Sequence, residues 1–256
     1  FVAVPAVATT SILFMILAVA FGMAVYRYKA PLGISTVIGV ILLFLCVWLG
    51  VQYPLNASPT FWTWFCLIYI FFASILPVWI LLQPRDYLNS FLLYASLIGA
   101  LLGLILGNPS LEFPAFITFN AASGPLFPML FVTVACGAIS GFHSLVSSGT
   151  TAKQLANEKD AKLIGYGAML IEGLLALVAL ATVAYLTKDG YASALKDLGG
   201  PTGVFSTGVG RFMSHFGIPI AFGTTFGALS VNAFCLTSLD TATRLARYAW
   251  EEFFST

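Results

Sequence analysis

Seven apolar stretches of about 20 residues each constrain this chain more than any other feature. At a rise of 1.5 Å per residue, a helix of this length crosses about 30 Å, the thickness of the hydrocarbon core of a bilayer. Together with 59% hydrophobic and only 8% charged residues, they predict an all-α integral membrane protein with about seven transmembrane helices, forming a single transmembrane domain over residues 1–256. The stretches cover roughly residues 4–26, 32–51, 61–82, 88–106, 127–148, 163–186 and 217–239.

The composition argues against several other classes of protein. A net charge of +1 gives no basic surface for nucleic acid, so no nucleic-acid partner is expected. The four cysteines fall inside apolar stretches without CxxC spacing, which indicates buried thiols rather than disulfides or metal ligands. No GxxxxGK[ST] sequence is present, so we expect neither ATP drive nor a bound cofactor or metal. No connection is long enough for a soluble domain, so any activity has to take place between the helices.

The lysines and arginines predict an orientation in the lipid bilayer. If the seven spans alternate, the connections on one side carry most of the positive charge, which places that side and the C-terminus in the cytoplasm and Phe1 outside. The first residue is not Met and no signal peptide follows it, so we expect further spans upstream of Phe1. The cytoplasmic set is Arg27, Lys29, Arg85, Lys153, Lys159, Lys162, Arg244 and Arg247, against Lys188, Lys196 and Arg211 on the other side.

The stretch 124–151 begins as an apolar helix and ends as a polar one. Hydroxyls, glycines and an imidazole in the second half of a span are costly in lipid, so they are expected to face protein or water. The two glycines spaced four apart and a third before the threonines predict a bend or an unwound segment, hence at least one broken helix. The candidate binding residues are Gly137, Ser140, Gly141, His143, Ser144, Ser147 and Ser148.

Two ionisable residues inside spans are candidates for proton binding. Glu172 lies well inside the sixth span, beside small residues that favour close helix packing and a buried carboxyl. Such a carboxyl loads and releases a proton near neutral pH, or it stays protonated and only bonds a neighbouring helix. His143 has the same two interpretations, a proton relay or ligand contact and a structural histidine, and its serine-rich surroundings favour neither.

Three charged residues at the cytoplasmic ends of spans are candidate gate residues. Arg85 and Asp86 follow the third span, where an adjacent arginine and aspartate are also typical of an interfacial anchor and a helix start. Asp240 ends the seventh span among hydroxyl residues. It is expected either to line a cytoplasmic gate or, as the safer prediction, to pair with Arg244 four residues later.

The segment 204–216 repeats apolar residues on one side of a predicted helix. This pattern indicates an amphipathic helix that lies at the membrane interface or enters the membrane as a re-entrant piece. A short surface helix packed on its neighbours is an equal alternative.

Three linked segments resemble one protein family. They are PVWILLQPRDYLNSFL, FPMLFVTVACGAISGFHSLVSSGTTAKQLANEKDAKLIGYGAMLIE and LTSLDTATRLAR. In this order they are similar to the carbon-starvation protein A family of bacterial inner-membrane transporters, and the likeness covers most of the chain. It corresponds to the later part of that family's membrane core, so the earlier spans of a complete protein are expected partners of this chain.

The resemblance implies uptake of small nutrients when carbon is scarce, with peptides as the substrate in one branch and pyruvate with a proton in another. It also implies the architecture of the amino acid, polyamine and organocation transporters, with inverted repeats and broken helices at the midplane. We therefore expect a multi-pass protein of the bacterial cytoplasmic membrane that works by alternating access. The polar stretch would line its path, and Glu172 with His143 would carry the coupling H+. Na+ is the alternative coupling ion.

Two other functions remain as alternatives. An intramembrane serine hydrolase is suggested by the AISG segment around Ser140, because a serine and a histidine within hydrogen-bond reach form a catalytic dyad. Against it, Ala138 stands where the rhomboid GxSG pattern has glycine, and His143 lies on the same helix as Ser140. The other alternative is a membrane sensor subunit that transports nothing.

Overall fold

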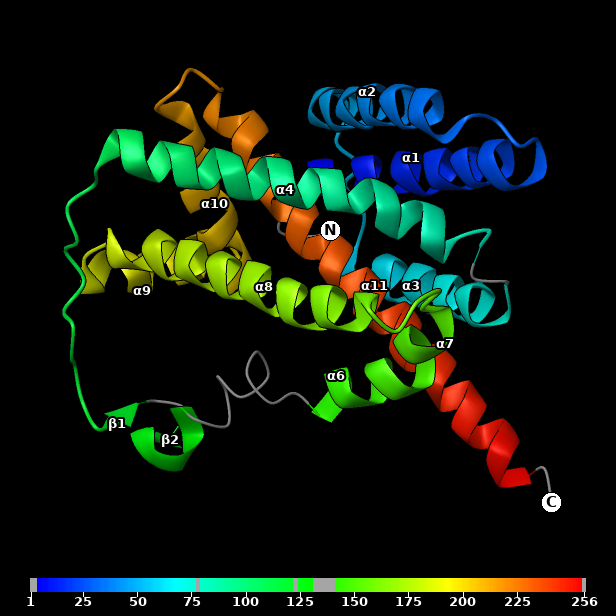
Figure 1. Cartoon of the computed structure of the whole chain (residues 1–256). Helices are drawn as coiled ribbons and strands as arrows, with labels where there is room; N and C mark the ends of the chain where they lie inside the picture. Colours follow the sequence, from blue (N-terminus) through cyan, green and yellow to red (C-terminus); the bar gives the residue numbers. More distant parts are fainter. Residues whose placement is uncertain (1–3, 77–78, 122–123, 131–140, 255–256) are drawn as a thin grey trace. The chain divides into compact units, whose positions relative to one another are not determined.

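The computed structural model describes residues 4–76, 79–121, 124–130 and 141–254, which form two compact units (Figure 1). The first comprises residues 1–110 and 189–256, and the second comprises residues 111–188. The regular structure of the described chain is helical apart from one antiparallel pair of two-residue strands. The prediction of an all-α protein is therefore confirmed for this part of the chain.

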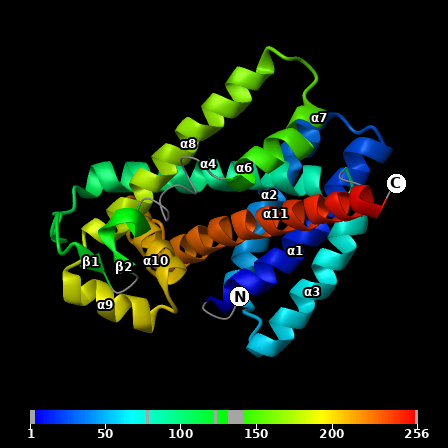
Figure 2. The same cartoon turned by 90° about the horizontal axis from the view of Figure 1, so that it is seen from below.

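Among the described residues, the first unit contains seven α-helices, of which α9 has its first residue, Lys188, in the second unit. α11 is the longest, and it packs on α10, α4, α3, α1 and α2 (Figure 2). At 35 residues it is about 50 Å long and exceeds the hydrocarbon thickness of a bilayer. The helices are α1 (Pro5–Gly22, continued by the π-helical η1, Met23–Arg27), α2 (Leu32–Gln52), α3 (Pro59–Ile75), α4 (Leu82–Gly107), α9 (Lys188–Asp197), α10 (Pro201–Ser214) and α11 (Ile220–Phe254).

The long helix described in the second unit is α8. The stretch predicted to bind solute departs from regular α geometry at η2, where five residues are π-helical, a feature common at functional sites. Whether a span is broken at bilayer depth stays a prediction. The elements are β1 (Asn120–Ala121), β2 (Gly124–Pro125), α6 (Gly141–Val146), η2 (Ser147–Thr151), α7 (Ala152–Gln154) and α8 (Asp160–Ala184).

Five helices among the described residues are long and apolar enough to cross a membrane: Pro5–Arg27, Leu32–Gln52, Leu82–Gly107, Asp160–Ala184 and Ile220–Phe254. They correspond to five of the seven predicted spans. The other two predicted spans are not established, because α3 is shorter and residues 131–140 of the 127–148 stretch lie outside the described residues. The count of seven and the inverted-repeat architecture stay predictions.

The boundary between the third and fourth predicted spans differs from the structure. We expected one span over residues 61–82 and the next over 88–106, but α3 ends at Ile75 and α4 already begins at Leu82. Leu76 is extended, as expected for a residue that precedes a proline in the sequence. Pro84 falls in the first turn of α4, where the missing N–H costs no hydrogen bond. Arg85 and Asp86 therefore lie inside a helix rather than between two helices.

Glycines let α10 approach both α4 and α11 closely. A Cβ on Gly103 of α4 would collide with the backbone carbonyl of Phe212 in α10. A Cβ on Gly223 of α11 would lie 2.8 Å from the Cα of Gly210 in α10. Such contacts between backbones are a main source of helix association in membranes. The predicted helix at residues 204–216 is present as α10, with Val209 and Phe212 buried, and its depth in the membrane stays a prediction.

We predict that Gly103→Ala lowers the melting temperature of the purified protein, because the added methyl group forces α4 and α10 apart at a cost of about 1–3 kcal/mol. Gly33→Ala is the matched control, since a Cβ on Gly33 in α2 meets nothing within 4 Å. Thermal unfolding in detergent measures both variants. Equal melting temperatures for the two variants would contradict the close packing of α4 on α10.

Candidate functional site: a buried ion pair beside a polar pocket

A buried ion pair joins three helices of the first unit. Arg85 in α4 and Asp240 in α11 have side chains that are only 1% and 0% exposed, and the Nη1 of Arg85 donates to the Oδ2 of Asp240 at 2.5 Å. The hydroxyl of Tyr69 in α3 donates to the same oxygen at 2.8 Å. Because charges removed from water are stable only when paired and hydrogen-bonded, this contact fixes how α3, α4 and α11 meet.

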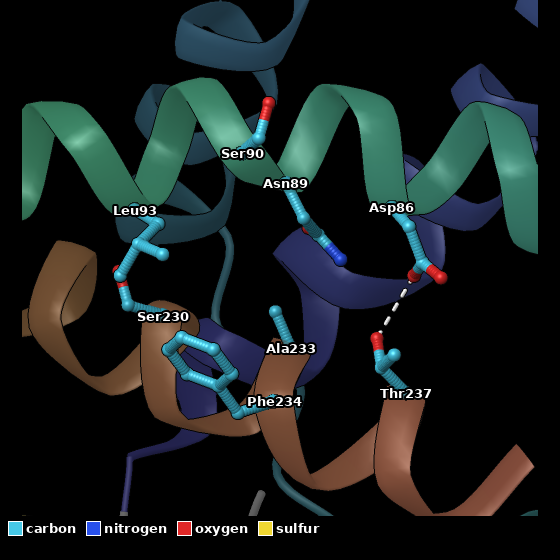
Figure 3. A pocket seen from close by; sticks show the side chains of 8 residues that line it. All are labelled: Asp86, Asn89, Ser90, Leu93, Ser230, Ala233, Phe234 and Thr237. Atoms are coloured by element: carbon cyan, nitrogen blue, oxygen red, sulfur yellow. Dashed lines mark hydrogen bonds between the residues drawn. The ribbon is translucent and has the colours of Figure 1, made fainter. Parts of the chain in front are cut away.

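The second nitrogen of the guanidinium group extends the network. The Nη2 of Arg85 donates to the Oγ1 of Thr237 at 3.0 Å and to the Oδ1 of Asp86 at 3.2 Å. The hydroxyl of Thr237 in turn donates to the same oxygen of Asp86 at 2.9 Å (Figure 3). One guanidinium thus serves two carboxylates, and the cluster carries a formal charge of −1.

Two further arginines of α11 hold the end of α3. Arg244 donates from Nη2 to the carbonyl oxygens of Ala73 and Leu76, at 3.0 and 3.1 Å, and Arg247 donates from Nη1 to the carbonyl of Ser74 at 2.6 Å. The last carbonyls of a helix lack partners within it and carry partial negative charge, so positive side chains stabilise this end. The predicted pairing of Asp240 with Arg244 is wrong, because Arg244 binds α3 and Asp240 binds Arg85.

A polar pocket of about 230 Å³ lies next to this network, between α4 and α11. Figure 3 shows side chains from the facing turns of the two helices. On each helix the residues follow the spacing i, i+3, i+4, i+7, which places them on one face. A cavity of this size holds several water molecules or a small solute. Its lining consists of Asp86, Asn89, Ser90 and Leu93 from α4 and Ser230, Ala233, Phe234 and Thr237 from α11.

The family model described as carbon starvation protein CstA matches residues 1–198 and 192–256. The chain belongs to this CstA family. The resemblance expected from the three sequence segments is confirmed.

Curated relatives in the family have names of transporters rather than enzymes. The pyruvate/proton symporter BtsT of Escherichia coli (strain K12) is 41% identical over 192 residues, 68% of this chain and 26% of its own length. The peptide transporter CstA of the same strain is 48% identical over 134 residues, 50% of this chain and 19% of its own length. The peptide transporter CstA of Helicobacter pylori (strain ATCC 700392 / 26695) is 36% identical over 285 residues, 88% of this chain and 41% of its own length.

The chain spans between 19% and 41% of the length of these three relatives. No solved structure matches it. The names speak against the intramembrane hydrolase considered above.

The structure brings the three predicted gate residues of this CstA-family chain together. Arg85, Asp86 and Asp240 form one network at the junction of α3, α4 and α11. The interpretation of Arg85 and Asp86 as an interfacial anchor fits the geometry less well, because Arg85 is almost completely buried. Their role as a gate stays a prediction.

The predicted solute-binding stretch belongs to the second unit and is described only in part. Gly137 and Ser140 lie outside the described residues, and for Gly141 and His143 only the helical backbone is described. The other three serines are exposed on this chain. Ser147 and Ser148 donate to carbonyls one turn earlier, at Ser144 for both, which leaves their oxygens free to accept further bonds. The binding role of the whole set stays a prediction.

Glu172 lies in the middle of α8 and is exposed on this chain. α8 is a candidate membrane span, so this carboxyl belongs to a segment expected to lie in the hydrocarbon. A carboxyl is costly against lipid. We therefore retain Glu172 as a candidate proton-binding residue, and its role in coupling stays a prediction.

Sequence reasoning missed most of the site that the structure assembles. Tyr69 stands in an aromatic-rich stretch and looks like an ordinary membrane residue. The spacing of Asn89 and Ser90 with Asp86, and of Ser230 with Thr237, was a usable signal, because each set places polar groups on one helical face. What the sequence alone does not show is that these two faces meet.

We predict that Arg85→Met lowers the free energy of unfolding by about 3–5 kcal/mol, because it leaves the carboxylate of Asp240 buried without its cation. The double variant Arg85→Met/Asp240→Leu is expected to lose less than the sum of the two single variants, by about 0.5–3 kcal/mol. The stabilities of the unmodified protein, the two single variants and the double variant are measured by unfolding in sodium dodecyl sulfate, monitored by tryptophan fluorescence.

Glu251→Gln is the control for removal of a charge pair, since Glu251 makes an exposed contact with Arg247 one turn away. It is expected to change stability by less than about 1 kcal/mol. Additive losses in the double variant would show that Arg85 and Asp240 do not stabilise one another.

Proposed function

We propose that this chain is part of a secondary active transporter that takes up small nutrients, peptides or pyruvate, across the bacterial cytoplasmic membrane when carbon is scarce. The observation that carries the proposal is the buried Arg85–Asp240 pair beside a polar pocket, both on helices apolar enough to span a membrane. Charged and polar groups at such places mark solute pathways. The names of the relatives, a pyruvate/proton symporter and peptide transporters, support the same class of function.

In this proposal, uptake follows an alternating-access cycle. The junction of α3, α4 and α11 acts as the cytoplasmic gate, with Arg85, Asp86 and Asp240 as its charged contacts. Separation of α3 from α11 would break the bonds of Tyr69 to Asp240 and of Arg244 to the end of α3, so these contacts hold one state of the cycle. The positive residues near the end of α11 favour a cytoplasmic C-terminus.

Transport is coupled to protons, with Glu172 and His143 as the carriers and Na+ as the alternative coupling ion. Glu172 supports this assignment because ionisable residues inside spans are costly in lipid and often mark proton pathways. We assign a solute path in the second unit to the serines of α6 and η2, together with Gly137, Ser140, Gly141 and His143.

We predict that Glu172→Gln abolishes the dependence of uptake on a proton gradient, because the amide cannot bind and release a proton. The measurement is uptake of radiolabelled dialanine and, separately, of pyruvate into proteoliposomes that hold the full-length protein, with and without an inward-directed pH gradient. Glu251→Gln is the matched control and is expected to behave as the unmodified protein does.

Unchanged gradient-driven uptake in Glu172→Gln would remove the proton role of this residue. Uptake that follows a sodium gradient instead would favour the alternative ion. Failure of the unmodified protein to accumulate either solute under any gradient would contradict the transporter proposal and favour the sensor subunit.

A further inference from the structure

The pocket between α4 and α11 has a chemical preference that follows from how Arg85 uses its donors. The two Nη nitrogens of a guanidinium carry four N–H groups. Nη1 of Arg85 donates to Tyr69 and Asp240, and Nη2 donates to Asp86 and Thr237. The remaining nitrogen, Nε, is buried, and Arg85 is not part of the pocket lining. The guanidinium therefore has no donor to offer to an anion in the pocket.

Asp86, in contrast, keeps acceptor capacity at the pocket. Its Oδ1 accepts bonds from Arg85 and Thr237, whereas its Oδ2 has no hydrogen bond within the described part of the chain. The side chain is 39% exposed, so a solute can reach it. Because Arg85 is shared with the fully buried Asp240, the cluster keeps its formal charge of −1 at the pocket.

The rest of the lining fits a small molecule with one polar end. Near Asp86 lies the amide of Asn89, whose buried Oδ1 has no hydrogen bond among the described residues. The hydroxyl of Ser90 points away from α11 (Figure 3) and donates to the carbonyl of Tyr87 at 2.7 Å. Farther along the two helices, the wall consists of the side chains of Leu93 and Phe234 (Figure 3). We expect the cationic group of a solute to lie beside Asp86 and its apolar group to lie beside Leu93 and Phe234.

We propose that this pocket binds the free ammonium group of a short peptide, with Asp86 as the counter-ion and the apolar wall around the first side chain. The inference rests on the proposed transport function and names the part of the solute that this site recognises. An ammonium inside apolar helices needs a carboxylate and further acceptors to offset its lost hydration. A monocarboxylate without an amino group finds no free cation in this pocket.

The test compares three probes on the full-length protein in detergent: dialanine, N-acetyl-dialanine and pyruvate. Binding is measured by isothermal titration calorimetry, so that no transport is required. Dialanine is expected to bind on the order of tenfold more tightly than its N-acetyl derivative, because acetylation removes the charge and two donors of the amino group. Pyruvate is expected not to compete with dialanine.

Asp86→Asn is expected to weaken dialanine binding by a similar factor and to leave the weak binding of N-acetyl-dialanine unchanged. Asp86→Glu, which keeps the charge, is expected to retain most of the affinity. Asp189→Asn is the matched control, since Asp189 is an exposed carboxylate of α9 and is absent from the pocket lining. The comparison of dialanine with its acetylated form needs no variant and decides the question even if Asp86→Asn does not fold.

Equal affinities for the free and acetylated dipeptides, competition by pyruvate, or an unchanged affinity in Asp86→Asn would each overturn the proposal, as would absence of dialanine binding. These failures are distinct from failure of transport. Proteoliposomes that accumulate pyruvate but do not bind dialanine would leave the transporter standing and remove the ammonium site. Binding of dialanine without uptake of any solute would support the ammonium site and contradict the transporter proposal.

Discussion

The contact between Arg85 and Asp240 is the interaction on which the first unit depends. The two residues are 155 positions apart and both are buried. Hydrogen bonds from or to Tyr69, Thr237 and Asp86 help to offset the lost hydration of the pair. Arg244 and Arg247 of α11 bind the end of α3. The charged side chains of α11 therefore hold both α3 and α4 against it. Glycine contacts bring α10 onto the other end of the same helix.

The pocket is a consequence of this pair. Once Arg85 is held against α11, the turns of α4 that follow it face the preceding turns of α11, and residues spaced i, i+3, i+4, i+7 on both helices line the gap. The pair also determines the charge of the gap, since Arg85 uses its terminal donors internally and Asp86 keeps an oxygen free. The same bonds thus fasten the helices and define what the pocket accepts.

The sequence predicted the elements better than it predicted their contacts. Apolar length located five spans, and the cost of charge in lipid singled out Arg85, Asp86 and Asp240. The pairing of Asp240 with Arg244 failed because spacing along one helix says nothing of a neighbouring helix end that competes for the arginine. The predicted span began at residue 88 because it was located by apolar length, whereas α4 begins at Leu82 with polar residues and Pro84 in its first turn, where proline is tolerated. Tyr69 carried no signal at all, since its role exists only after α3 meets α11.

The central claim is that a solute reaches the pocket between α4 and α11, and thiol labelling tests it most directly. In full-length protein whose native cysteines are replaced, Ala233→Cys places a thiol on the pocket wall, and Ala100→Cys, at a position that is 0% exposed in α4, serves as the control. We predict that a water-soluble methanethiosulfonate modifies Ala233→Cys rapidly, that dialanine slows this reaction, and that Ala100→Cys stays unreactive. If Ala233→Cys were as unreactive as the control in protein that still takes up solute, the solute would follow another path and the account would be wrong.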